Sequence, residues 1–106
     1  MAKTIIPSKT RIKFDLIKVR KCVLILRAIN HKLRQRMIDL LEENDELTVT
    51  DIYVKLRLEQ SVASQHLSIL RKAGVVATQR KGKFIYYSRD IDEIKRINTF
   101  ITGLVG

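Results

Sequence analysis

The stretch that decides the fold is QSVASQHLSILRKAGVV, residues 60–76. Apolar residues recur in it every three or four positions, which predicts a helix over residues 60–73. The buried side of that helix is expected to hold Ala63, Leu67, Leu70 and Ala73. Gly74 follows as the residue best suited to the left-handed conformation that ends a helix. The other side carries small hydrogen-bonding groups instead of the long charged side chains that favour solubility, so its composition indicates close approach to a partner.

The residues before this stretch complete a recognisable unit. Thr48 and Asp51 form a capping-box pattern that predicts a short helix over residues 49–56, and a tight turn, RLE, leads into the next helix. Such a pair of helices describes a helix-turn-helix, whose second helix enters the major groove of DNA. We expect this helix to contact base edges through Gln60, Ser61, Ser64 and Gln65. Further along the helix, Ser68 and Arg71 are expected to contact phosphates.

After Gly74 the sequence period changes from helical to extended. Strands are predicted over residues 75–80 and 84–88, joined by Lys81-Gly82-Lys83. A hairpin with a basic tip directly after a helix-turn-helix would act as a wing, over residues 75–88, that reaches the DNA backbone or the minor groove. The wing residues expected to contact DNA are Arg80, Lys81 and Lys83.

Three further helices are predicted, over residues 10–28, 31–44 and 90–104. Asn30 is the expected cap of the second, and Asp90 with Glu93 the capping box of the third. The first carries an apolar heptad seam, formed by Ile12, Leu16, Val19, Val23 and Leu26, and the last carries an isoleucine stripe, which indicates that these two helices contact another subunit. The residues expected at the dimer interface are Ile12, Leu16, Val19, Val23, Ile94, Ile97, Ile101 and Leu104. The stripe of the last helix could instead cap the monomer core.

Length and composition bound the class of protein. The 106 residues suit one domain, mainly helical with a small hairpin, over residues 10–106 after a flexible basic tail over 1–9. The net charge of +10 indicates a polyanion as partner, nucleic acid before membrane, and it arises in residues 1–36, which hold eleven Lys/Arg against Asp15 alone. The longest apolar run, Cys22–Leu26, is far below the ~20 residues that span a bilayer. One cysteine and no signal-peptide core favour a cytoplasmic protein without a membrane partner.

The segment from Ala28 to Asp90 resembles the ArsR/SmtB family of bacterial winged-helix repressors. RQRMIDLL (residues 34–41) resembles the family's second helix, residues 47–51 the opening of its third, residues 60–76 its recognition helix, and KGKFIYY (residues 81–87) its wing. The resemblance implies a fold of order α-α-α-α-β-β-α and a homodimer built from the first and last helices. It also implies binding to an imperfect palindrome in a promoter, with release when an effector binds.

The departures from the family pattern concern its sensing sites. Many metal-sensing members carry two thiols in the pattern E-L-C-x-C-D, and here ELTVTD (residues 46–51) has threonine at both places. The other common site uses Asp and His on the last helix, which here has no His, and Cys22 has no partner for a disulfide within the chain. We therefore expect no metal and no cofactor, and the effector stays unknown. In the turn, Arg57 and Glu59 replace the usual glycine and serine, and Glu59 would repel phosphate if it faced DNA.

Competing functions come from other classes. The main alternative to a sequence-specific repressor of double-stranded DNA is a winged-helix module that binds a protein or RNA without reading a DNA sequence. An enzyme is not expected, because two histidines, one cysteine and four glycines assemble no nucleophile–base pair, metal cluster or phosphate loop. His31 and His66 have no Cys or His mate at ligand spacing. We expect His31 to be an exposed polar residue and His66 a packing residue.

Overall fold

The structure, a computed structural model, describes residues 15–105, and side chains as far as Gly103. The expected tail over 1–9, the first residues of the predicted helix 10–28 and the side chains of Ile12 and Leu104 lie outside that part. The elements in chain order are α1 (Leu16–Ile29), α2 (Lys32–Asn44), β1 (Glu46–Thr48), α3 (Val49–Leu56), α4 (Gln60–Lys72), β2 (Val76–Lys81), β3 (Phe84–Arg89) and α5 (Ile91–Val105). In this part of the chain, five helices and a small antiparallel sheet follow the predicted order, with one extra strand.

Local hydrogen bonds fix where the helices begin. Thr48 and Asp51 form the predicted capping box, in which each side chain accepts the other residue's backbone N–H at 3.1 Å. The predicted cap of α2 was wrong: Nδ1 of His31, not the side chain of Asn30, accepts the N–H of Leu33 at 3.1 Å. Asn30 is instead the C-terminal cap of α1, since its backbone N–H donates to Leu26. His31, whose backbone is extended, therefore separates the cap of α1 from the first residue of α2.

Helix α1 starts later than the sequence pattern indicated. Asp15 is extended, and its side chain accepts the N–H of Lys18 at 3.1 Å, so the helix begins at Leu16 rather than at residue 10. An aspartate that caps the first turn in this way marks a helix start. The heptad pattern alone could not show this, because apolar spacing says nothing about where the backbone turns into the helix.

The sheet has three strands in the order β1-β3-β2, all antiparallel. The predicted hairpin is present, with Val76 opposite Arg89 and Lys81 opposite Phe84. The expected three-residue tip was too long: Lys81 belongs to the ladder, and Gly82, at φ +63°, with Lys83 makes the turn. Strand β1 was not predicted, because its three residues are too few to show an alternating pattern and their partner is a distant strand, with Leu47 opposite Tyr87.

The core lies where the helix-turn-helix packs on α1 and α2. Met37, Leu41, Ile52, Leu67 and Leu70 are fully buried. Ala63 is buried beside them, which confirms the predicted inner side of α4, while Ala73 is partly buried. Because three helices meet over these side chains, the orientation of α4 is fixed by apolar packing and its opposite side stays available.

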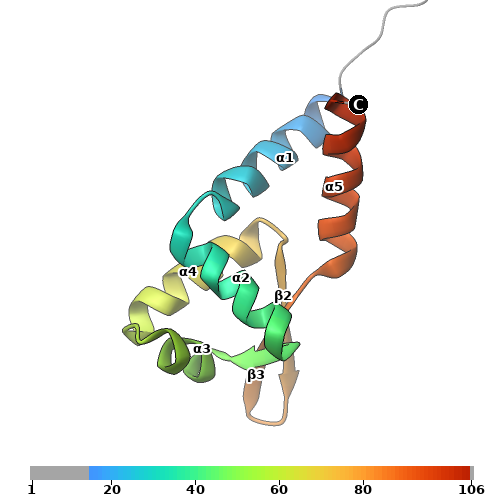
Figure 1. Cartoon of the computed structure of the whole chain (residues 1–106). Coiled ribbons are helices and arrows are strands. Elements are labelled where there is room, and N and C mark those ends of the chain that lie inside the picture. The colour runs from blue at the N-terminus through green and yellow to red at the C-terminus, as the bar shows by residue number, and fades with distance from the viewer. Residues whose placement is uncertain (1–14, 106) are drawn as a thin grey trace, which may run out of the picture.

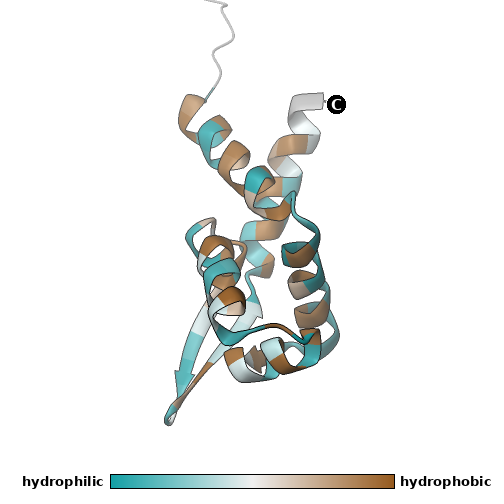
Figure 2. Ribbon diagram, turned by 90° about the vertical axis from the view of Figure 1, so that its left-hand side faces the viewer, coloured by the Kyte–Doolittle hydropathy of each residue, from teal (hydrophilic) through white to brown (hydrophobic). Residues whose placement is uncertain are grey.

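Helices α1 and α5 extend from one end of the molecule, and the hairpin tip points toward the other (Figure 1). The side of α1 that faces the core holds Cys22, Ile25 and Ala28. The heptad seam lies elsewhere on the helix: Leu16 is 60%, Val23 39% and Leu26 45% exposed. Apolar segments accordingly run along the projecting part of α1 in Figure 2. Ile94 and Ile97 of α5, in contrast, pack partly against the protomer's own core.

Candidate nucleic-acid interface

The outer side of α4 gathers the residues that the sequence predicted to face DNA. Ala63, Leu67 and Leu70 on the opposite side are buried. The six predicted residues are all exposed: Gln60, Ser61, Ser64, Gln65, Ser68 and Arg71. At 3.6 residues per turn these positions form one continuous surface along the helix. The only cation among them is Arg71, in the last turn. The surface is thus small, hydrogen-bonding and nearly neutral, a composition suited to base edges in the major groove.

The N-terminus of α4 carries an exposed carboxylate. Glu59 is the N-cap residue, with φ −71° and ψ 147°, but its side chain makes no capping hydrogen bond. Within residues 15–105 it also has no ion-pair partner. A helix N-terminus attracts anions through its unpaired N–H groups and its dipole. Glu59 therefore places its own negative charge at a point that would otherwise favour a phosphate.

The wing presents its cations unequally. Arg80 donates from Nε to the carbonyl of Gly82 at 3.1 Å, which holds its guanidinium at the tip. Lys81 pairs through Nζ with Glu46 Oε1 at 2.6 Å and lies 5.4 Å from the Tyr86 ring centroid. Lys83 lies 5.5 Å from the ring centroid of the neighbouring phenylalanine. Arg80 and Lys83 are consequently the tip cations without a carboxylate partner in the described part of the chain, while Lys81 is tied to β1.

The two histidines lie side by side, a contact between distant segments that the sequence did not indicate. The ring centroids of His31 and His66 are 4.8 Å apart, because the cap of α2 lies against the middle of α4. Burial lowers the pKa of His66 below its usual 6.5, and His31 and Arg34 lower it further. Nδ1 of His66 and Nε of Arg34 are buried without a hydrogen-bond partner among the residues that the structure describes. His66 is thus a packing residue, and residues 15–105 contain no group of three or more His, Cys, Asp or Glu side chains that could hold a metal ion.

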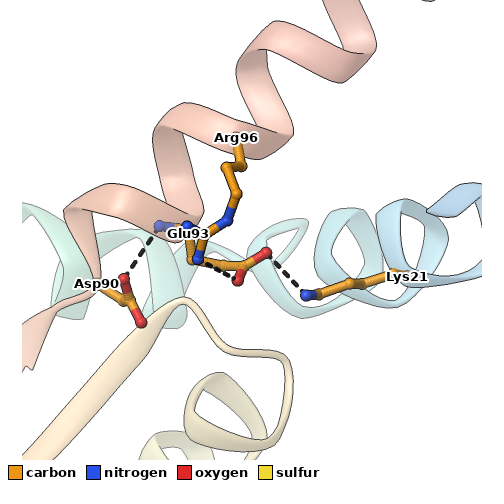
Figure 3. Close-up of polar contacts among 4 residues, drawn as sticks. All are labelled: Lys21, Asp90, Glu93 and Arg96. Carbon is orange, nitrogen blue, oxygen red and sulfur yellow. Dashed lines mark hydrogen bonds and ion pairs between the residues drawn. The ribbon is translucent and has the colours of Figure 1, made fainter.

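A charged cluster joins α1 to α5 (Figure 3). Glu93 is buried, and its Oε1 pairs with Nζ of Lys21 while its Oε2 pairs with Nη2 of Arg96, both at 3.0 Å. Hydrogen bonds from Arg96 and Lys21 lower the pKa of Glu93. Asp90 accepts the N–H of Glu93 at 3.0 Å, so the predicted cap is confirmed, but the Glu93 side chain turns to these cations instead of closing the box. Sequence reasoning missed this, since Lys21 is far away along the chain.

Comparison with known proteins decides what this arrangement belongs to. A family model described as "Bacterial regulatory protein, arsR family" matches residues 31–78, from the cap of α2 into β2. The transcriptional repressor SdpR of Bacillus subtilis is 39% identical over 64 residues, which cover 60% of this chain and 70% of the relative. The chain belongs to the arsR family. The transcriptional activator HlyU of Vibrio cholerae is 35% identical over 75 residues, or 71% of this chain and 68% of HlyU.

Solved structures support the same family. The transcriptional repressor PagR of Bacillus anthracis superposes with a TM-score of 0.70 at 29% identity, covering 82% of this chain and 99% of PagR. This arsR-family protein is therefore a winged helix-turn-helix, DNA-binding transcriptional regulator. None of its described helices is long and apolar enough to cross a membrane. The named relatives include both repressors and an activator, so the direction of regulation is not set by family membership.

Proposed function

We propose that this arsR-family member is a homodimeric repressor that binds an imperfect palindrome through two copies of α4 and releases it on binding an effector. The observation that carries the proposal is the outer side of α4, where six polar residues are exposed over a fully packed inner side. A surface exposed only to water gains nothing from such small side chains, whereas a helix that enters the major groove needs them to bring its backbone close to the base edges.

The residues of α4 divide by their distance from the start of the helix. The first turns of a recognition helix contact base edges, so Gln60, Ser61, Ser64 and Gln65 are the proposed readers. A glutamine can pair with adenine through two hydrogen bonds, and a serine can donate or accept. Ser68 and Arg71, further along, are the proposed phosphate contacts of this helix. In the wing, Arg80 and Lys83 are the stronger phosphate contacts, since Glu46 already neutralises Lys81.

The proposed dimer uses the apolar surface that the protomer leaves uncovered. Leu16 and Val23 are exposed and Val19 is half-buried, all on the heptad seam of α1. On α5, Ile101 and the parts of Ile94 and Ile97 that the core leaves exposed would contribute the remainder, with Ile12 and Leu104 beyond the described side chains. Two copies related by a twofold axis would place their α4 helices in successive major grooves, about 34 Å apart.

Selection of bound sequences from a random duplex pool tests the DNA-reading part. We expect an enriched palindrome, and we expect Gln65→Ala to relax preference at one position of each half-site at a cost of ~1–3 kcal/mol. Gln79→Ala, which removes the same group from β2, should leave the preferred sequence unchanged. Equal affinity for random and enriched duplexes, falling steeply with salt, would leave only electrostatic binding and would favour a protein- or RNA-binding module.

The oligomeric state is tested separately by light scattering. Val23→Glu places a charge on the heptad seam and should yield monomers, because burying an unpaired carboxylate in an apolar interface is costly. Ile17→Glu is the matched control, since Ile17 is 79% exposed on another side of α1. A dimer that survives Val23→Glu, or that Ile17→Glu disrupts equally, would refute the assignment of the seam as the interface.

A further inference from the structure

A cavity of ≈ 450 Å³ lies between α1 and α5. Its volume is within the range of about 300–1,000 Å³ that holds small ligands in proteins. The apolar part of the wall comes from Cys22 on α1 and from Ile97 and Phe100 on α5. These helices carry the proposed dimer surface, and Ile97 on α5 belongs to both. The α1 wall of the cavity, however, lies on the side of Cys22, which is 5% exposed, and not on the exposed heptad seam.

The cavity is strongly cationic on its polar side. Lys18, Lys21, Lys95 and Arg96 line it, and Glu93 is the one acid among the described residues that line it. Both oxygens of Glu93 are already engaged, at 3.0 Å, by Lys21 and Arg96. Lys18 has no carboxylate within pairing distance in the described part of the chain, and its Nζ lies 6.0 Å from the Phe100 ring centroid. Unbalanced cations beside an apolar wall favour a ligand that has both an anionic and an apolar part.

We propose that the cavity between α1 and α5 binds a small amphipathic carboxylate, with its anionic group on Lys18, Lys21 and Arg96 and its apolar body against Cys22 and Phe100. The two exposed cations that hold Glu93 are 53% and 66% exposed and so can turn toward a second anion. The bound carboxylate competes with Glu93 for them. Ligand binding is therefore linked to the ion pairs of Glu93, which is a buried carboxylate of the protein.

Glu93 lies near the end of the recognition helix, which gives the ligand a route to DNA binding. A Cβ added at Gly74 would lie 3.6 Å from Cγ of Glu93, so the carboxylate side chain is close to the turn that ends α4. Asp90, at the start of α5, donates its N–H to the carbonyl of Val75 at 2.9 Å. When the ligand takes the cations, Glu93 keeps a buried charge without its partners, which favours movement of α5 away from Gly74. Ligand and DNA affinity are then coupled, each lowering the other.

Ligand binding is tested without DNA, by calorimetry and amide NMR with octanoate and benzoate as probes. We expect saturable octanoate binding with a Kd below about 1 mM, and shifts centred on residues 18–22 and 95–100. Octan-1-ol lacks the anionic group and inorganic phosphate lacks the apolar body, so each should bind at least about tenfold more weakly than octanoate. No saturable binding of octanoate or benzoate, or equal binding of octan-1-ol, would overturn the site.

Variants separate the cavity from general charge. Lys18→Gln and Lys21→Gln should each weaken octanoate binding at least about tenfold, and Lys21→Arg, which keeps the charge and the Glu93 pair, should restore it. Lys32→Gln on α2 removes one exposed cation outside the cavity and should have no effect. Equal weakening by Lys32→Gln, or none by either cavity variant, would contradict the proposal.

The regulatory step alone rests on the proposed repressor function. Octanoate should weaken binding to the selected duplex in the wild-type protein but not in Lys18→Gln. If octanoate binds and DNA affinity does not change, the coupling through Glu93 is refuted while the ligand site stands. If no duplex is bound even without octanoate, the proposed repressor function fails, and the calorimetric result still decides the ligand site.

Discussion

Arg57 and Gly74 end the two helices of the helix-turn-helix with the same left-handed backbone, at φ 55° and φ 82°. In each, the following residue closes the turn: Leu58 donates to the carbonyl of Tyr53 at 2.9 Å, and Val75 to that of Leu70 at 3.1 Å. Glycine adopts this conformation without steric cost, whereas a residue with a Cβ is strained by roughly 1–2 kcal/mol. The family's usual glycine is thus absent where the backbone favours it.

Arg57→Gly should therefore raise the free energy of unfolding, by about 0.5–1 kcal/mol after the extra freedom of glycine in the unfolded chain is subtracted. Urea denaturation measures the change. Arg57→Ala is the control, because it removes the guanidinium but keeps the Cβ, and it should give no such gain. If both variants stabilise the protein equally, the effect belongs to the arginine side chain and not to the backbone.

Gly74→Ala is expected to act in the opposite direction. The nearest atom to an added Cβ is 3.6 Å away, an ordinary contact, so the cost is conformational and not a clash. A loss of about 1 kcal/mol in unfolding free energy follows from the left-handed φ. A much larger loss in urea denaturation would show that Glu93 cannot adjust to the methyl group.

Glu59→Gln should tighten DNA binding about threefold at low salt, because it removes a negative charge from the end of α4 that approaches phosphates. Gel shifts at two salt concentrations measure the gain, which should shrink as salt screens the repulsion. Asp92→Asn, which removes an exposed carboxylate from the first turn of α5, serves as the matched control. Unchanged affinity in Glu59→Gln would mean that Glu59 points away from DNA in the complex.

The stability of the wild-type protein should fall as the pH drops below the ordinary histidine pKa of 6.5. Burial lowers the pKa of His66 in the folded state, so the unfolded chain takes up a proton first, and stability is lost between 6.5 and the lower folded value. His66→Leu should remove this slope in urea denaturation at several pH values. His31→Asn keeps a cap on α2 but removes the neighbouring imidazole, and should give an intermediate slope. An unchanged slope in His66→Leu would assign the pH dependence elsewhere.

Glu93→Gln should destabilise the protein at neutral pH by about 1 kcal/mol, a modest value because Lys21 and Arg96 are exposed and partly solvated. Hydrogen bonds from these cations lower the pKa of Glu93, so its contribution is present above the ordinary value of 4.5 and is lost as the pH falls below it. The difference between wild type and variant should close over that range. A difference that stays constant with pH would show that the charge of Glu93 contributes nothing.

The sequence predicted best the features that depend on neighbours within a few residues. The Thr48–Asp51 capping box and the Gly74 helix end are hydrogen-bond patterns between residues at most five positions apart. The two sides of α4 follow from helical periodicity. Errors arose where two neighbouring residues could both cap a helix. Whether Asn30 or His31 caps α2 depends on where α1 ends.

Contacts between distant segments could not be predicted in this way. Strand β1 exists because Leu47 pairs with Tyr87, and three residues have no strand signal of their own. The approach of His31 to His66 depends on how α2 crosses α4. The sequence indicated that α1 has an apolar seam, but it did not show that the core would take a different side of the helix.

The sequence by itself determined the order of the elements, the inner and outer sides of α4 and the family resemblance, because periodicity, caps and turn residues are local properties of the chain. Only the tertiary structure decided that Glu93 pairs with Lys21 and Arg96 and packs near Gly74, joining α1, α5 and the end of α4. The physical reason is that a buried charge is stabilised only by partners that packing brings to it, whatever their separation in sequence.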